Sequence, residues 1–250
     1  MFRDLVDDFD DEFTQPDMLL DVPFVPTDKR VIREMLRLAG VGRKDLVYDL
    51  GSGEGDIVIA AARDHGARAI GIEIDPLRIA DAMEYAADAY VEHRVDFIEG
   101  NLFDADFHDA TVVTLYLLES INLQLRPRLL DELKPGTRVV SHAFHMGDWQ
   151  PDNTRELCGV TLYKWVVPAK VAGTWVWEGV DGNIYQVELE QKFQQVSGKA
   201  WINDNAATLE NATLRGGTLE LQIGVPSTGL AEAFTLTFSR NTLDTIEHEV

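Results

Sequence analysis

Cysteine is almost absent from this sequence: Cys158 is the single one among 250 residues. One thiol excludes an internal disulfide framework and any zinc site built from a cysteine cluster. Free cysteine usually behaves as a small apolar residue, so we expect Cys158 to be buried or incidental. The chain is 45% hydrophobic and long enough for one sizeable core, or for a medium domain and a small one.

Long hydrophobic runs are also missing. No apolar stretch approaches the roughly 18 residues that a membrane-spanning helix needs. The first 13 residues are acidic and lack the basic and apolar regions of a signal peptide. We therefore expect a cytoplasmic protein that has no membrane partner.

Positive charge is scarce, with 22 Lys and Arg against 43 Asp and Glu, a formal net charge of −21. Such a surface repels the phosphates of nucleic acids and anionic lipids, so we expect neither as a partner. It attracts cationic partners, such as lysine-containing protein segments or polyamines. Solubility or adaptation to salt explains the charge equally well, and the composition does not decide between these interpretations.

The N-terminal part is an acidic arm followed by an extended segment. Residues 21–27, DVPFVPT, contain two prolines that favour a stiff, extended backbone. Thr27 or Asp28 is a suitable N-cap for the next helix, which the sequence predicts to run to a glycine stop at Gly40.

Residues 45–144 alternate between apolar strands and helices. The predicted strands are 45–50, 67–75, 94–101, 110–117 and 137–144, and the predicted helices between them are 57–66, 76–91 and 121–133. In the last of these helices, Pro127 requires a helix start near it or a kink. Nearly continuous apolar strands separated by helices predict a parallel sheet that is covered on both faces. Right-handed crossovers then give an α/β, doubly wound, Rossmann-like fold.

Beyond about residue 155, helical periodicity gives way to short runs with period-two alternation. The first run or two can complete the parallel sheet as antiparallel edge strands. The rest predicts a small antiparallel β domain, a meander or partial barrel, whose edge strands are compatible with a homodimer. The predicted organisation is an arm and extended segment at 1–27, a Rossmann-like domain at 28–168 and the β domain at 169–250.

The stretch VYDLGSGEGD, residues 47–56, predicts a ligand-binding turn between a strand and a helix. A dinucleotide turn has the pattern G-x-G-x-x-G, but Asp56 occupies the position of its third glycine and Glu54 lies nearby. Both acids disfavour a pyrophosphate, because like charges at close range repel. S-adenosylmethionine has no phosphate and carries a sulfonium and an ammonium group, so it suits this turn better. The residues that we predict to hold it here are Asp49, Gly51, Ser52 and Gly53.

Two further polar residues follow the next strands. Glu73 ends the second strand, where its carboxylate can accept both ribose hydroxyls of the cofactor. Asn101 follows the third strand, where its amide could contact the adenine. Each alone is also an ordinary surface acid or turn residue. Together with the glycine turn, they indicate a binding site for the methyl donor S-adenosylmethionine.

Over roughly residues 21–168 the sequence resembles the archaeal and mitochondrial seven-strand protein-lysine methyltransferases. The segments that carry the resemblance are DVPFVPTDKRVIREMLRLAGVGRKDLVYDLGSGEGDIVIAAA, GIEID, EGN, ATVVTLYLLESIN and LKPGTRVVSHAF. The resemblance implies a class I methyltransferase fold and a lysine amine as methyl acceptor. It also implies that four residues of the extended segment lie over the cofactor and acceptor: Phe24, Val25, Pro26 and Thr27. The C-terminal β region departs from this family.

Methyl transfer from a sulfonium is an in-line displacement, for which the protein mainly supplies alignment and a dry pocket. A lysine acceptor, with an ordinary pKa of about 10.4, must first become neutral, and desolvation favours this. Tyr116 and Glu119, where the fourth strand ends, are our candidate catalytic residues. Tyr116 could orient the amine and Glu119 could hold it as a cation. A packing aromatic and a helix N-terminal acid are their ordinary alternatives.

His142 and His145 follow the fifth strand, and one of them could accept a proton, although a structural histidine is the more ordinary interpretation. With Asp148 they are weak grounds for a metal site, and we predict none. Three tryptophans of the C-terminal region could form an aromatic cage for a methylammonium group, but we interpret them as core packing. They are Trp175, Trp177 and Trp201.

The sequence thus predicts an S-adenosylmethionine-dependent methyltransferase that transfers a methyl group to an amine, foremost a lysine side chain of a protein. One alternative is a small-molecule methyltransferase whose β domain shapes the acceptor site. A more remote alternative is a non-catalytic module that binds S-adenosylmethionine.

Overall fold

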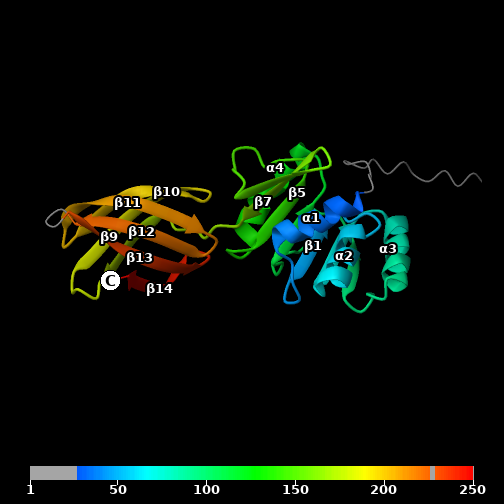
Figure 1. Cartoon of the computed structure of the whole chain (residues 1–250), viewed down its shortest axis with the longest axis horizontal. Coiled ribbons are helices and arrows are strands. Elements are labelled where there is room, and N and C mark those ends of the chain that lie inside the picture. Colours follow the sequence, from blue (N-terminus) through cyan, green and yellow to red (C-terminus); the bar gives the residue numbers. More distant parts are fainter. Residues whose placement is uncertain (1–26, 226–228, 250) are drawn as a thin grey trace, which may run out of the picture.

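The computed structural model describes residues 27–225 and 229–249, and these form two seven-stranded sheets. Figure 1 shows the two sheets side by side along the long axis of the molecule. Residues 27–166 include the first sheet and all four described helices, and residues 173–249 include the second sheet.

The first sheet has the strand order β3-β2-β1-β4-β5-β7-β6. Its strands are β1 (Leu46–Leu50), β2 (Arg68–Glu73), β3 (Val95–Glu99), β4 (Val112–Leu115), β5 (Arg138–His142), β6 (Asn153–Leu157) and β7 (Val160–Val166). The first five are parallel, while β7 pairs antiparallel with β5 and β6 pairs antiparallel with β7. The predicted Rossmann-like sheet with antiparallel edge strands is therefore confirmed.

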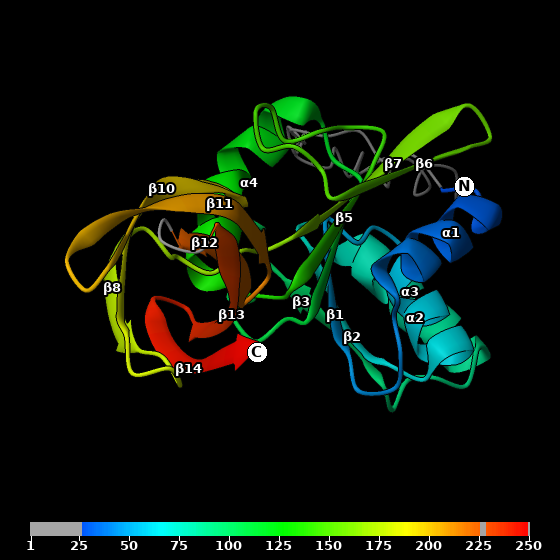
Figure 2. The ribbon, with the colours of Figure 1, turned by 60° about the vertical axis from the view of Figure 1, so that its left-hand side comes forward.

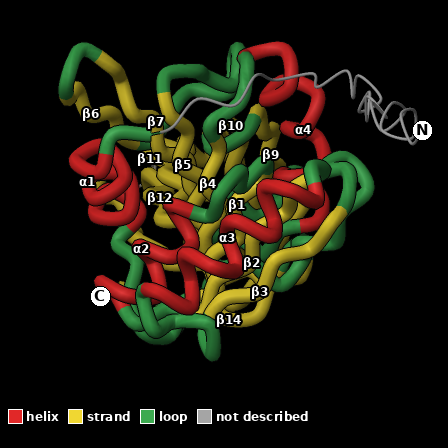
Figure 3. Tube along the Cα trace, turned by 90° about the vertical axis from the view of Figure 1, so that its right-hand side faces the viewer, coloured by secondary structure: helices red, strands yellow, loops and turns green. Residues whose placement is uncertain are grey.

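Helices cover both faces of this sheet. They are α1 (Lys29–Ala39), α2 (Asp56–His65), α3 (Pro76–Asp88) and α4 (Glu119–Glu132). Figure 2 shows α1, α2 and α3 on one side of the sheet and α4 on the other, and Figure 3 shows the first three next to one another. None of the described helices is both long and apolar enough to cross a membrane.

The first sheet has a hydrophobic core on each face. Successive residues of a strand pack into opposite cores, because their side chains point to opposite faces of the sheet. Val47 and Val112 belong to the core under α1 and α2, whereas Tyr48 and Val113 belong to the core under α4. Burial on both faces explains why these strands are apolar almost throughout.

The helix boundaries follow local signals. Asp28 caps α1, since its carboxylate accepts a hydrogen bond from the Arg30 amide at 2.8 Å, and Gly40 ends that helix at φ 66°. The expectation for Pro127 was a helix start near it or a kink. The start near Pro127 is wrong, because α4 begins at Glu119 and includes Pro127 in its interior.

The second sheet is an antiparallel meander in which every strand pairs with its neighbour in sequence. Its strands are β8 (Gly173–Glu178), β9 (Ile184–Lys192), β10 (Gln195–Ile202), β11 (Asn205–Arg215), β12 (Thr218–Val225), β13 (Leu230–Ser239) and β14 (Thr242–Glu249). It curls around an aromatic core in which Trp177 packs against Tyr185 and Phe234. Trp175 packs edge-on against Phe238, so these two tryptophans serve packing, as expected.

Two local features differ from the sequence-based expectations. Strand β6 was not predicted, because its side chains are almost all exposed and show no apolar alternation. Cys158 is exposed in the turn between β6 and β7 at φ 54°, so it is not a buried thiol. Most of the predicted N-terminal arm lies outside the described residues, and the domain boundaries remain a prediction.

Candidate active site

The glycine turn lies between β1 and α2, at the carboxyl edge of the first sheet. Gly51, Gly53 and Gly55 all have positive φ, of 83°, 54° and 81°, a backbone conformation that favours glycine. Space is also limiting: a Cβ on Gly51 would lie 2.9 Å from the Leu117 side chain, and one on Gly55 would lie 2.7 Å from the Phe97 ring. Backbone conformation therefore favours glycine at all three positions, and neighbouring side chains exclude a larger residue at Gly51 and Gly55.

Glu73 at the end of β2 binds this turn. Its Oε2 accepts a hydrogen bond from the Gly53 amide at 2.7 Å, while Oε1 accepts from the Ile74 and Asp75 amides at 2.9 and 3.0 Å. The side chain is buried. Oε1 already accepts two hydrogen bonds, whereas Oε2 accepts one and has a further lone pair that a ribose hydroxyl could use. The predicted ribose contact stays a prediction.

Asp49, the next-to-last residue of β1, is a buried acid with one hydroxyl partner. Only 3% of the residue is exposed, and Thr114 Oγ1 donates a hydrogen bond to Oδ1 at 2.7 Å. Burial raises the pKa of Asp49 to about 7, against the effect of the Thr114 bond, and the charges of Glu73 and Asp56 raise it further. A cation beside these carboxylates would relieve their repulsion, whereas a pyrophosphate would increase it. The turn therefore fits a cationic cofactor.

Ser52 is placed differently from its neighbours. Its hydroxyl is buried and has no hydrogen-bond partner among the described residues. A Cβ added to Gly71 of β2 would lie 2.5 Å from that hydroxyl oxygen, so the side chain is turned toward β2. Its amide donates to the Ile72 carbonyl at 2.9 Å. The predicted contact between Ser52 and the cofactor stays a prediction.

Asn101 is exposed in the loop that follows β3. Its Oδ1 accepts a hydrogen bond from the Phe103 amide at 2.9 Å, and the preceding Gly100 amide donates to the Glu73 carbonyl at 2.8 Å. The structure thus brings Asn101 close to Glu73 along the same edge of the sheet. Its role toward the adenine stays a prediction.

Arg128 of α4 holds the loop that carries Asn101, and the sequence-based reasoning missed it. Its guanidinium donates to the carbonyls of Phe103 and Ala105, the latter at 2.8 Å, and pairs with Glu132 at 2.6 Å. No sequence pattern near Arg128 indicates this contact, because the two loop carbonyls lie more than 20 residues away in the sequence.

Tyr116 lies just beyond β4 and packs against His142 at the end of β5. The two ring centroids are 3.8 Å apart. His142 is buried, its Nδ1 has no partner among the described residues, and burial lowers its pKa, so the ring is neutral at pH 7. The next residue, Leu117, contacts the glycine turn at Gly51. Tyr116 is therefore adjacent in sequence to a residue that contacts the predicted cofactor turn.

Glu119 begins α4 and faces His145 of the β5–β6 loop. Glu119 Oε2 lies 3.6 Å from His145 Nε2, and both side chains are half-exposed. The Gly147 amide donates to His145 Nδ1 at 3.0 Å, so a neutral His145 carries its proton on Nε2, toward Glu119. The imidazole thus lies beside the carboxylate at a distance longer than a hydrogen bond. The predicted role of a histidine as proton acceptor stays a prediction.

The three residues considered for a metal site are not assembled. No group of three or more histidine, cysteine or acidic side chains is placed to hold a metal ion in the described ranges 27–225 and 229–249. Asp148 instead pairs with Arg126 at 2.6 Å and with Lys192 at 3.0 Å.

The predicted cover over the cofactor falls mostly outside the described residues: Phe24, Val25 and Pro26 are not described. Thr27 is half-buried and directly precedes the Asp28 cap of α1. The covering role of this segment stays a prediction.

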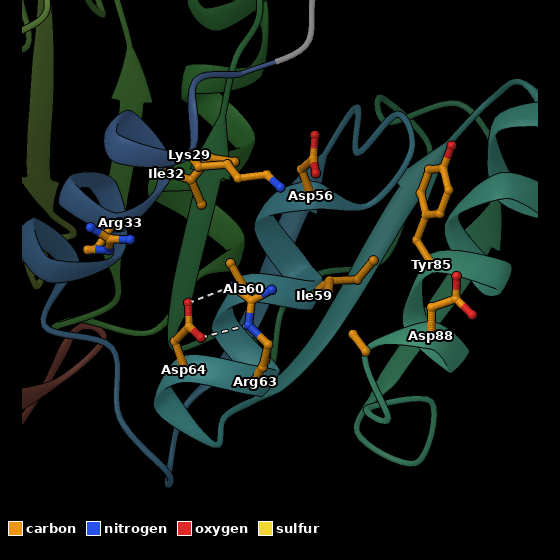
Figure 4. Close-up of a pocket in the computed structure, with 11 residues that line it drawn as sticks. Lys29, Ile32, Arg33, Asp56, Ile59, Ala60, Arg63, Asp64, Tyr85 and Asp88 are labelled. Carbon is orange, nitrogen blue, oxygen red and sulfur yellow. Dashed lines mark hydrogen bonds and ion pairs between the residues drawn. The ribbon is translucent and has the colours of Figure 1, made fainter.

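A cavity of about 490 Å³ lies elsewhere, on the outer side of α1, α2 and α3. In Figure 4 the Lys29 ammonium points toward the Asp56 carboxylate, and Arg63 pairs with Asp64. Ile59 and Ala60 of α2 also line it. Apart from Asp56, beside the glycine turn, the cavity shares no residue with the predicted site, and it is lined by charges of both signs.

Known proteins are similar to this chain over the region that contains the turn. Residues 49–153 match the ANTKMT methyltransferase domain. A protein-lysine N-methyltransferase from Saccharolobus islandicus (strain REY15A) is 47% identical over 131 residues, which are 52% of this chain and 81% of the relative. The chain belongs to the ANTKMT-type family of methyltransferases. It is an S-adenosylmethionine-dependent enzyme, as the glycine turn and Glu73 predicted.

Two further relatives of this methyltransferase show how far the likeness extends. A mouse (Mus musculus) adenine nucleotide translocase lysine N-methyltransferase is 33% identical over 139 residues, which are 56% of this chain and 60% of the relative. A solved structure of an RNA methyltransferase from Salinibacter ruber, in complex with S-adenosyl-L-homocysteine, is 55% identical. It covers 59% of this chain and 96% of its own, with a TM-score of 0.58. The family match ends at Asn153, so the second sheet lies beyond it.

Proposed function

We propose that this methyltransferase methylates lysine side chains of proteins. The observation that carries the proposal is the Glu119–His145 pair, next to Tyr116 and His142 at the ends of β4 and β5. A half-exposed carboxylate at this edge of the sheet attracts an ammonium group. The names of two relatives, both lysine N-methyltransferases, support the same acceptor class.

In this proposal, one set of residues binds the cofactor and another binds the acceptor. S-adenosylmethionine supplies an electrophilic methyl group on its sulfonium and leaves as a neutral thioether. Asp49 and Glu73 provide the negative charge that suits this cation. Glu119, beside His145, binds the lysine ammonium, and the neutral rings of Tyr116 and His142 exclude water. Desolvation by these rings lowers the pKa of the amine, against the opposite effect of the Glu119 charge. The amine then gives its proton to water, and its lone pair becomes free to attack the methyl group.

A lysate experiment tests the acceptor class. The protein is incubated with S-adenosylmethionine labelled in its methyl group and with a cell lysate, and protein, RNA and small molecules are then separated. We expect label in acid-precipitated protein and, after hydrolysis, in methylated lysine. Label confined to the small-molecule fraction would support the alternative in which the β region shapes a metabolite site, and would contradict the proposal.

RNA is the second candidate acceptor, because the Salinibacter ruber protein is described as an RNA methyltransferase. The net charge of −21 opposes RNA binding, since phosphate contacts depend on basic side chains. Ribonuclease treatment before precipitation separates the two cases: label that disappears with the RNA favours this second candidate.

A further inference from the structure

The second sheet contacts the first through the turn between β9 and β10. Lys192 and Gln195 pair in the strand ladder, so Phe193 and Gln194 form a two-residue turn. Three consecutive residues there contact three consecutive residues of the β5–β6 loop. The pairs are Lys192 Nζ with Asp148 Oδ2 at 3.0 Å, the Phe193 ring with the Trp149 ring at 6.0 Å between centroids, and Gln194 Nε2 with the Gln150 carbonyl at 2.7 Å.

Phe193 is an unusual residue for this turn. Its φ is 56°, in the left-handed region that bulky side chains rarely adopt. Two-residue hairpin turns favour Asn, Asp and Gly, and the β10–β11 turn indeed has Asn203 and Asp204, both at positive φ. Strain of this kind persists where surrounding contacts hold it, often at functional positions. Here the holding contacts are the stacking on Trp149 and the Arg126 guanidinium, 5.4 Å from the Phe193 ring.

The β5–β6 loop is also held from the first sheet. Trp149 is fully buried, and its carbonyl accepts a hydrogen bond from Trp165 Nε1 at 2.8 Å. Arg126 of α4 donates to the Met146 carbonyl at 2.8 Å and to Asp148 at 2.6 Å. A Cβ on Gly147 would lie 2.8 Å from the Leu123 side chain of α4, so the loop packs closely on that helix. The β9–β10 turn thus covers a loop that already lies against α4 and β7.

This loop also carries His145, three residues before Asp148. His145 Nδ1 accepts from the Gly147 amide, and its Nε2 faces Glu119. Any displacement of the loop therefore moves the imidazole that lies 3.6 Å from Glu119. We propose that the β9–β10 turn, with Phe193 as its anchor, is a positioning element for the acceptor site. The second sheet would then act as a clamp on the β5–β6 loop. This inference rests on the proposed role of Glu119.

The substitution Phe193→Asn tests the clamp in the full-length protein. Asn tolerates positive φ, so the variant should keep the hairpin and fold, although the loss of the stacked ring should lower its melting temperature by a few degrees. We expect amide hydrogen exchange within residues 143–150 to rise by about tenfold or more, and exchange in the glycine turn to stay unchanged. With poly-L-lysine as methyl acceptor, KM should rise several-fold, while KM for S-adenosylmethionine stays the same.

Two matched variants separate the clamp from a general effect on the second sheet. Phe193→Tyr keeps the stacked ring and should restore the wild-type exchange and KM. Val180→Ala removes an exposed apolar side chain from the β8–β9 turn of the same sheet and should leave both quantities unchanged.

Wild-type exchange within residues 143–150 of Phe193→Asn would overturn the clamp. So would a faster exchange that leaves KM for poly-L-lysine unchanged. Failure of the proposed function is distinguishable: wild-type enzyme would then place no methyl group on poly-L-lysine, and the exchange experiment alone would decide whether the turn holds the loop.

Discussion

Asp49 shows, at the scale of a single residue, how cofactor binding and folding stability oppose each other. Its pKa of about 7 in the folded protein lies above the ordinary value of 3.8. Between about pH 4 and pH 7 the folded state therefore keeps a proton on Asp49 that the unfolded state has already lost. The free energy of unfolding falls as the pH rises through this range, because the buried carboxyl is harder to ionise than the exposed one. By the usual conversion, a fully ionised Asp49 lowers the free energy of unfolding by about 4 kcal/mol.

The affinity for S-adenosylmethionine should depend on pH through Asp49. A cationic ligand favours the ionised carboxylate, so binding should weaken by about tenfold for each pH unit below 7. Titration calorimetry between pH 5.5 and 8 measures this. Asp49→Asn is the control: it should bind more weakly at pH 8, lose the pH dependence and unfold at higher denaturant concentration than wild type at pH 8. An unchanged pH profile in Asp49→Asn would contradict the role of this carboxylate.

Little of this residue-level arrangement is visible in the sequence. The glycine spacing, Glu73 and Asn101 could be identified because each follows a strand that the apolar pattern marks. The bond between Glu73 and the Gly53 amide, and the contact of Tyr116 with His142, join residues 20 or more positions apart. Only the folded sheet brings these partners together.

At the scale of elements, α4 connects the two halves of the site. Its first residue, Glu119, lies at the proposed acceptor site, and Arg128, further along the helix, holds the loop that carries Asn101. A helix was predicted at residues 121–133, with Pro127 requiring a start or a kink near it. The helix instead starts eight residues earlier, so that packing of Ile121, Leu125 and Leu129 outweighs the local effect of the proline.

Arg128→Ala should lower stability and loosen the 101–107 loop. The loop carbonyls of Phe103 and Ala105 would lose a charged donor, which predicts a loss of about 2 kcal/mol in the free energy of unfolding. Denaturant unfolding and hydrogen exchange of the loop measure the two effects. Arg63→Ala, which removes an exposed ion pair with Asp64, should change the free energy by about 0.5 kcal/mol or less. Equal effects of the two variants would contradict the proposed anchoring.

At the scale of the whole molecule, the enzyme combines a family-type sheet with a second sheet that the family match does not include. Alternation of apolar and polar residues was enough to predict the antiparallel second sheet. Its contact with the β5–β6 loop could not be predicted, because Phe193 and Trp149 lie 44 positions apart and no local pattern marks a positive φ at Phe193. Strand β6 was not predicted for a related reason: its side chains are mostly exposed, so its sequence lacks the alternation of apolar and polar residues that indicates a strand.

The molecule as a whole is therefore a methyltransferase whose first sheet includes the predicted cofactor turn and the proposed acceptor site, and whose second sheet contacts the loop that carries His145. The central claim is that Glu119 receives a lysine ammonium at that site. Its most direct test compares wild type with Glu119→Gln, an uncharged side chain of the same shape, in methyl transfer to protein lysine at saturating S-adenosylmethionine.

We predict that kcat/KM for the protein acceptor falls about 10- to 100-fold in Glu119→Gln, because a charge-assisted hydrogen bond to the ammonium is lost. The Kd for S-adenosylmethionine should stay at the wild-type value. Equal kcat/KM values for the two proteins would contradict the account.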